Sequence, residues 1–98
     1  MIKQISVEEL KIKQTSEKLF YLFDVRTREE WSEGNIPGAR LMLDVPSEEL
    51  ESLDKNADIV FQCRSGARSQ RMAEEFEQKG FANLANLTGG ILAWEQQS

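Results

Sequence analysis

The sequence predicts an α/β fold in which a mainly parallel sheet carries helices on both faces. Short apolar runs alternate along the chain with segments whose apolar residues recur at helical spacing. Strands that alternate with helices belong to a parallel sheet, because a crossover connection must lead to each parallel strand. The run 19–25 is almost continuously apolar, which is typical of a strand buried on both faces.

The first predicted elements are an edge strand and a helix. Residues 2–5 fit a short edge strand. Ser6 and Glu9 then fit a capping box, in which each residue bonds the backbone N–H of the other. We expect the helix that follows to reach about residue 14.

The strand 19–25 leads into a second helix start. Thr27 and Glu30 have the spacing of another capping box, and Gly34 follows the short helix that they would open. The sequence therefore predicts a strand–helix unit in this region.

The middle of the chain predicts a turn, a strand and a third helix. Residues 36–39 combine proline and glycine in the order of a tight turn, and a short strand at 40–42 would follow. Ser47 is the expected N-cap of the next helix, because acidic residues fill its first turn. Leu50 and Leu53 would then face the core.

The last part of the chain predicts two strands, each followed by a helix. The strand 58–62 precedes Cys63 and a helix that ends at Lys79-Gly80. The strand 84–87 precedes Thr88-Gly89-Gly90 and a final helix, whose apolar residues are Ile91, Leu92 and Trp94.

Length and composition exclude several classes of protein. The 98 residues suit one domain, 1–98, and the net charge of −5 argues against a nucleic-acid or membrane surface. No long apolar segment or signal peptide is visible, so we expect a cytoplasmic protein. One cysteine allows no internal disulfide, and the absence of histidine excludes a Ser-His-Asp triad and the usual zinc sites. We expect no metal and no cofactor.

Cys63 is the candidate reactive residue. A lone cysteine is commonly a buried apolar residue, but Arg64 and the turn-forming Ser65-Gly66 follow this one directly. A thiol at a helix N-terminus and beside arginine has a lowered pKa, and no imidazole is present to activate it. Arg68 lies where the helix dipole disfavours a cation, so the sequence predicts an anion held by guanidinium and backbone N–H groups.

Four motifs, in order, carry a family resemblance. Residues 63–69, CRSGARS, resemble the C-R-x-G-x-R-S loop of rhodanese-like sulfurtransferases. Residues 23–26 with 30–31, residues 34–39, and residues 87–90 with Trp94 resemble the D-V-R, E-W, G-H-I-P-G-A and L-x-G-G…W segments of that family. Asn35 departs from the pattern, since the family often has histidine there, and this change affects the packing of the turn.

The resemblance implies a rhodanese-like fold with five strands and a sulfurtransferase activity. Cys63 would accept a sulfane sulfur from thiosulfate, polysulfide or a persulfide and pass it to a thiol, to cyanide or to a sulfur-accepting protein. An ionised thiol needs no general base for this reaction. The expected substrate-binding residues are those that follow Cys63: Arg64, Ser65, Gly66, Ala67 and Arg68.

Two other functions compete with sulfur transfer. Cysteine phosphatases of related fold have five residues between cysteine and arginine, whereas four separate Cys63 from Arg68. The shorter loop favours a single sulfur atom over a phosphate with its ring of N–H donors. A non-catalytic protein-binding module is the second alternative, since fold does not fix function. The intact Cys63, Arg64 and Arg68 argue against it.

The remaining polar and aromatic residues of the motifs are predicted to be structural. Asp24 is not expected to take part in catalysis, because a carboxylate beside a thiolate would raise the pKa of the thiol. Arg26 and Glu30 are expected to pair with each other or with chain ends, and Arg71 points either to solvent or to the loop. The expected core aromatics are Trp31, Phe76 and Trp94.

Overall fold

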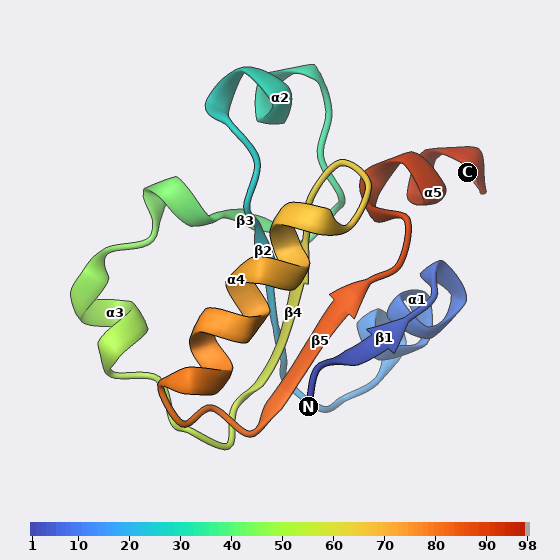
Figure 1. The fold of residues 1–98 in the computed structure, drawn as a ribbon. Coiled ribbons are helices and arrows are strands. Elements are labelled where there is room, and N and C mark those ends of the chain that lie inside the picture. Colours follow the sequence, from blue (N-terminus) through green and yellow to red (C-terminus); the bar gives the residue numbers. More distant parts are fainter. Residues whose placement is uncertain (98) are drawn as a thin grey trace.

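A computed structural model describes residues 1–97 and contains a sheet of five strands, all parallel. The strands lie in the order β1-β5-β4-β2-β3. They comprise β1 (Lys3–Ile5), β2 (Tyr21–Asp24), β3 (Arg40–Leu41), β4 (Asp58–Gln62) and β5 (Asn83–Leu87). The predicted α/β class and parallel sheet are confirmed, and β1 is an edge strand as expected. β4 lies at the centre of the sheet, between β5 and β2 (Figure 1).

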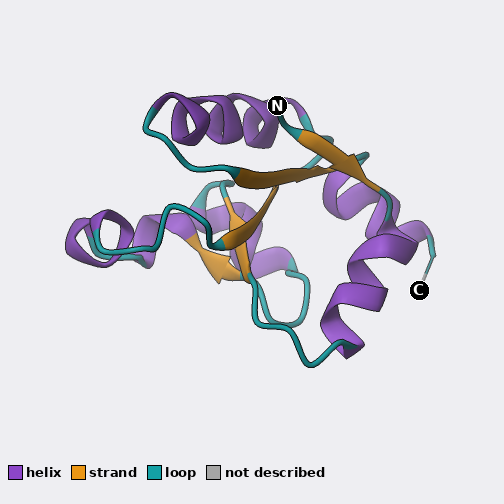
Figure 2. Ribbon diagram, turned by 90° about the horizontal axis from the view of Figure 1, so that it is seen from below, coloured by secondary structure: helices purple, strands orange, loops and turns teal. Residues whose placement is uncertain are grey.

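Helices cover both faces of this sheet (Figure 2). They are α1 (Val7–Thr15), α2 (Arg28–Glu33), α3 (Ser47–Glu51), α4 (Ala67–Gln78) and α5 (Gly90–Gln96), with a short 3₁₀ helix, η1 (Met42–Asp44). One buried cluster packs α1 and α5 on the sheet through Leu10, Val60 and Ile91. The opposite cluster contains Phe61 and, from α4, Ala73 and Phe76.

The first two helices begin as the sequence predicts, and the third does not. Both predicted capping boxes are present, at Ser6 with Glu9 and at Thr27 with Glu30. The prediction that Ser47 caps α3 is wrong, because Pro46 is the N-cap and Ser47 is already helical. Proline fixes its own φ near the value that this position needs, so the chain turns into the helix one residue earlier.

The strand β2 is shorter than the apolar run 19–25. Leu19 is 90% exposed, whereas Leu22 and Phe23 are buried on opposite faces of the sheet. A parallel partner decides where the strand begins: β4 pairs with β2 from Tyr21 onward. The apolar character of Leu19 therefore does not extend the strand.

Two of the three predicted core aromatics are less buried than expected. Phe76 is buried and lies with its ring centroid 5.0 Å from that of Phe61. Trp94 is half-buried and packs against the cluster beneath α5. Trp31 is half-buried and belongs to neither buried cluster, so the core prediction for it is wrong. Within residues 1–97, no helix is both long and apolar enough to cross a membrane.

Candidate active site

The turn between β4 and α4 places Cys63 at the carboxyl end of the central strand. Open α/β sheets bind ligands at this edge. Gly66 is the N-cap of α4 and has a φ of 114°, a left-handed conformation that side chains disfavour. This conformation lets the chain reverse its direction between β4 and α4. The first N–H groups of α4 therefore point back toward Cys63.

The sulfur of Cys63 lies buried in a cradle of hydrogen-bond donors. Its Sγ accepts from the backbone N–H of Gly66 at 3.1 Å and of Ser69 at 3.4 Å. The Ser69 hydroxyl lies 3.3 Å from the same atom. Cys63 is only 1% exposed, but it is not buried as an apolar residue. The loop buries the sulfur and supplies polar partners for it.

These donors decide the acidity of the thiol. Burial raises the pKa of Cys63 and is the largest single influence on it. The hydroxyl of Ser69 and the backbone N–H groups of Ser69, Gly66 and Ser65 lower the pKa, and together they outweigh burial. The pKa of Cys63 therefore lies below its ordinary value. We expected Arg64 and Arg68 to share in this effect, but hydrogen bonds provide the main part of it.

A second layer of hydrogen bonds, which includes β5 and α5, supports the cradle. Ser69 Oγ lies 2.5 Å from Asn86 Oδ1, and Asn86 Nδ2 donates to the carbonyl of Gly66 at 3.2 Å. Two N–H groups of α5 hold the other side of the loop: that of Ile91 donates to the carbonyl of Cys63 and that of Leu92 to the carbonyl of Arg64. The carbonyls thus point away from the sulfur and the N–H groups toward it.

Gly90 is required for this close approach of α5. A Cβ atom there would lie 2.5 Å from the carbonyl oxygen of Arg64 and still closer to that of Cys63. Both separations are well inside van der Waals contact.

The positive charge of Arg68 is balanced by a carboxylate of the same chain. Its guanidinium donates to both carboxylate oxygens of Glu30, at 2.9 and 3.0 Å, which joins α4 to α2. This contact, followed by the N–H of Thr27, lowers the pKa of Glu30 to about 2. The sequence predicted a bound anion as the partner of this cation, and in the structure the anion is Glu30.

The predicted pair of Arg26 with Glu30 is wrong. Arg26 instead donates to Asp24 through its backbone N–H, Nε and Nη2, and both side chains are buried. Its guanidinium also donates to the backbone carbonyls of Glu30, within α2, and of Gly34, the C-cap of α2. Asp24 is thus committed to anchoring α2, which agrees with the structural role predicted for it.

Arg64 differs from the other cation of the loop. Within residues 1–97 its guanidinium forms no ion pair or hydrogen bond, and the residue is exposed. It lines a pocket of about 210 Å³ together with Gly34, Leu92 and three carboxylates, Glu30, Glu33 and Glu95.

The other residues predicted to bind substrate differ in how exposed they are to solvent. Ser65 and Ala67 are exposed, whereas Gly66 is half-buried. Arg71 is exposed and lines a separate hollow with Arg68 and Val25, on the outer side of α4.

Asn35, the departure from the family pattern, has a local role. Its Nδ2 donates to the carbonyl of Trp31 at 3.1 Å and so satisfies a backbone group at the end of α2.

Gln62, the residue before Cys63, is fully buried. Neither its Nε2 nor its Oε1 has a hydrogen-bond partner within residues 1–97. Such an amide destabilises the folded state by about 1–3 kcal/mol.

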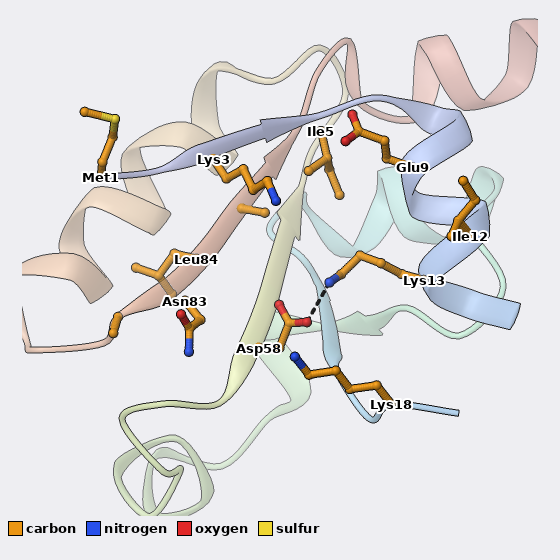
Figure 3. A pocket seen from close by; sticks show the side chains of 12 residues that line it. Met1, Lys3, Ile5, Glu9, Ile12, Lys13, Lys18, Asp58, Asn83 and Leu84 are labelled. Carbon is orange, nitrogen blue, oxygen red and sulfur yellow. Dashed lines mark hydrogen bonds and ion pairs between the residues drawn. The ribbon is translucent and has the colours of Figure 1, made fainter. Parts of the chain in front are cut away.

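A hollow of about 620 Å³ lies away from Cys63. Figure 3 shows it between α1, β1 and β5, with Lys3, Lys13 and Lys18 around it and Lys13 paired to Asp58 at 2.6 Å. None of the residues of the cysteine loop lines it.

The sequence analysis assigned no role in the site to three residues that shape it: Ser69, Asn86 and Gly90. Ser69 stands in the quoted loop motif, and Asn86 and Gly90 stand in or beside the quoted Gly-Gly segment. Their polar atoms or small size touch the loop only after β5 lies beside β4, and no local pattern shows that pairing. The signal for Gly90 was its glycine pair, which the sequence could assign only to a helix start.

The parallel sheet and the cysteine at the end of its central strand define a class of α/β proteins with a thiol in an N–H-lined loop. The chain belongs to the rhodanese-like domain family, whose model matches residues 6–97. It is 43% identical over 99 residues to a putative sulfurtransferase, YtwF, of Bacillus subtilis, covering 99% of this chain and 94% of that protein. It is 35% identical to a sulfurtransferase of Allochromatium vinosum, covering 96% and 89% of the two chains.

A solved structure supports the same family. The rhodanese-like domain protein of Staphylococcus aureus superimposes with a TM-score of 0.81 at 37% identity, covering 95% of this chain and 91% of that one. The fold prediction is therefore confirmed, and the relatives support a sulfurtransferase role at the level of the family.

Proposed function

We propose that this protein transfers a sulfane sulfur from a small donor to a nucleophilic acceptor, with Cys63 as the residue that carries the sulfur. The observation that carries the proposal is the cradle, in which Ser69 and the N–H groups of the turn surround Sγ. Such donors stabilise negative charge on sulfur without a base, in a chain that contains no histidine.

The reaction has two displacements and no net oxidation. The Cys63 thiolate attacks the outer sulfur of the donor, a new S–S bond forms, and the donor's bond to that sulfur breaks. The bonding electrons leave with sulfite or with a thiolate, according to the donor. The acceptor then attacks the terminal sulfur of the persulfide, and Cys63 departs as a thiolate. The same N–H groups stabilise the charge at the start and at the end.

Donor recognition is assigned to Arg64. It has no ion pair within residues 1–97, and its pocket of about 210 Å³ suits a small donor. Thiosulfate, polysulfide and persulfides all fall in this class, and the acceptor is a thiol, cyanide or a sulfur-accepting protein. A reducing compartment such as the cytoplasm is part of the proposal, because it keeps the single cysteine free.

The test is a donor panel read by intact mass. Incubation with a sulfane-sulfur donor should add one sulfur to the wild-type chain, and Cys63→Ser should lose both this adduct and turnover, because a serine hydroxyl is not ionised near neutral pH. Retained turnover in Cys63→Ser would refute the proposal. Efficient hydrolysis of an aryl phosphate that depends on Cys63 would favour the phosphatase alternative instead.

Arg64 and Arg68 should have different effects in the same assay. Arg64→Ala should lower kcat/KM for thiosulfate more than for a less charged persulfide donor, because it removes the unpaired cation. Arg68→Ala should impair all donors alike, because it removes the link to Glu30 that fixes the start of α4. Equal profiles across donors for the two variants would contradict this division.

A further inference from the structure

The Ser69 hydroxyl has more acceptors around it than protons. Its Oγ lies 2.5 Å from Asn86 Oδ1, 3.2 Å from the carbonyl of Gly66 and 3.3 Å from Cys63 Sγ. A hydroxyl donates only one hydrogen bond and accepts through two lone pairs. These contacts therefore cannot all be donations from Ser69 at the same time, and the shortest of them leads to Asn86.

The orientation of the Asn86 amide is fixed by its other partners. Its Nδ2 donates to the carbonyl of Gly66 at 3.2 Å and to Oε1 of Gln4, from β1, at 3.0 Å. A backbone carbonyl only accepts hydrogen bonds, so a flipped amide would bring two oxygens together there. Asn86 therefore presents its oxygen to Ser69. Both side chains are buried, at 4% and 0% exposure, so water does not replace either partner.

We propose that Asn86 is a positioning residue, which holds the Ser69 hydroxyl proton while Cys63 is a neutral thiol and releases it to the sulfur when the sulfur is negative. The proposal rests on the proposed function, in which Cys63 is the residue that becomes charged. In the neutral state the thiol donates to Ser69 Oγ, and Ser69 donates to Asn86. When Cys63 ionises, its proton passes to water and the hydroxyl turns about its Cβ–Oγ bond toward Sγ.

The charged groups near the cradle come from the cysteine loop and from four elements. Arg64 belongs to the loop, Arg68 of α4 pairs with Glu30 of α2, and the Asp24–Arg26 pair lies at the end of β2. Glu95 of α5 lies in the pocket of Arg64. The variants used in the test change none of these groups, so a shift in the titration of Cys63 reports on Ser69 and Asn86.

The decisive experiment is a double-mutant cycle read from the titration of the single cysteine. The ¹³Cβ resonance of Cys63 gives its pKa in four proteins: wild type, Ser69→Ala, Asn86→Ala and the double variant. Ser69→Ala should raise the pKa. Asn86→Ala should lower it by roughly half to one unit, because the neutral state loses its proton acceptor while the charged state keeps its donor. In the Ser69→Ala background, Asn86→Ala should have no effect.

Gln4→Ala is the matched control, because it removes an outer hydrogen bond of Asn86 and leaves the contact with Gly66. It should leave the pKa of Cys63 unchanged. A shift from Asn86→Ala that is equal in both backgrounds, or absent in both, would overturn the proposal and leave Asn86 with a packing role only.

A measurement on the wild-type protein covers the case in which Asn86→Ala does not fold. The side-chain amide resonances of Asn86 in the wild type should shift with pH at the same midpoint as Cys63, because Oδ1 loses its donor when the sulfur ionises. A flat Asn86 signal through the ionisation of Cys63 would overturn the proposal. None of these readouts uses a sulfur donor, so a protein that shows the coupled shifts but transfers no sulfur would refute the proposed function alone.

Discussion

Four of the five α-helices within residues 1–97 begin in one of two different ways. α1 and α2 are closed by their own side chains, since Ser6 and Thr27 each accept from the N–H three residues later. α4 and α5 begin at Gly66 and Gly89, both in the left-handed conformation, and neither start has a side-chain cap. The first pair uses the N–H groups of its first turn locally, and the second pair leaves those groups for other acceptors.

The N–H donors that serve the site come from the two helices that have no side-chain cap. The open start of α4 gives N–H groups to Cys63 Sγ, and the open start of α5 gives N–H groups to the carbonyls of Cys63 and Arg64. One helix thus holds the sulfur and the other orients the loop around it. A side-chain cap at either position would take up the donors that the site uses. Variants at the two kinds of helix start should therefore differ in their effect on Cys63.

The largest effect is expected from Gly90→Ala, which closes the gap between α5 and the loop. Its Cβ would overlap the carbonyl oxygens of Cys63 and Arg64, and its φ of 58° is strained for alanine. We expect a loss of about 2–5 kcal/mol in the free energy of unfolding and a rise in the pKa of Cys63. Urea unfolding and the titration of Cys63 measure the two effects.

Gly80→Ala is the matched control for this change. Gly80 also has a positive φ, 97°, but a Cβ there meets no atom within 4 Å. Only the backbone strain remains, about 1–2 kcal/mol, and the pKa of Cys63 should not change. If Gly80→Ala and Gly90→Ala cost the same, the close approach of α5 would not matter.

A smaller effect is expected when the side-chain cap of α2 is removed. Thr27→Ala removes the hydroxyl that accepts from the N–H of Glu30, which costs about 1 kcal/mol in typical helices. Because the Thr27 hydroxyl does not contact the cysteine loop, the pKa of Cys63 should stay at its wild-type value. Unfolding in urea and the ¹³Cβ titration separate the outcomes. A shifted thiol pKa would show that the closed and open starts are not independent.

The smallest effect is expected from Glu30→Gln, which keeps a capping residue and removes the charge opposite Arg68. The pKa of Glu30 is lowered to about 2, so its pairing stabilises the fold above the ordinary pKa of about 4.5 and loses this effect as the pH falls through about 2. Partial exposure limits the contribution to less than about 1 kcal/mol. The stability difference between wild type and Glu30→Gln should therefore shrink from pH 5 to pH 2. A difference that is constant over this range would contradict the ion pair.

Local patterns were sufficient to predict the parts of the fold that residues specify with near neighbours. The two capping boxes and the glycine at the end of α4 lie within a few residues of the atoms they contact. Arg68 and Glu30 are 38 residues apart, and Ser69 and Asn86 are 17 apart. Their pairing depends on the order of the strands, which no short pattern contains. The sequence therefore located the cysteine loop but not the residues that hold it.

The support of the loop by β5 and α5 also has a consequence for the order of folding. Asn86, Ile91 and Leu92 hold the carbonyls of Gly66, Cys63 and Arg64, and all three lie later in the chain than the cysteine. Contacts between distant segments form late, because closing the intervening chain costs entropy before it gains contacts. In a nascent or partly unfolded chain, β4 and the first turn of α4 can already bring the N–H groups of Gly66 and Ser69 to the sulfur, but the donors of β5 and α5 do not yet hold the carbonyls of the loop. The complete loop around Cys63 therefore forms only after β5 and α5, from the C-terminal part of the chain, have docked beside β4 and the loop.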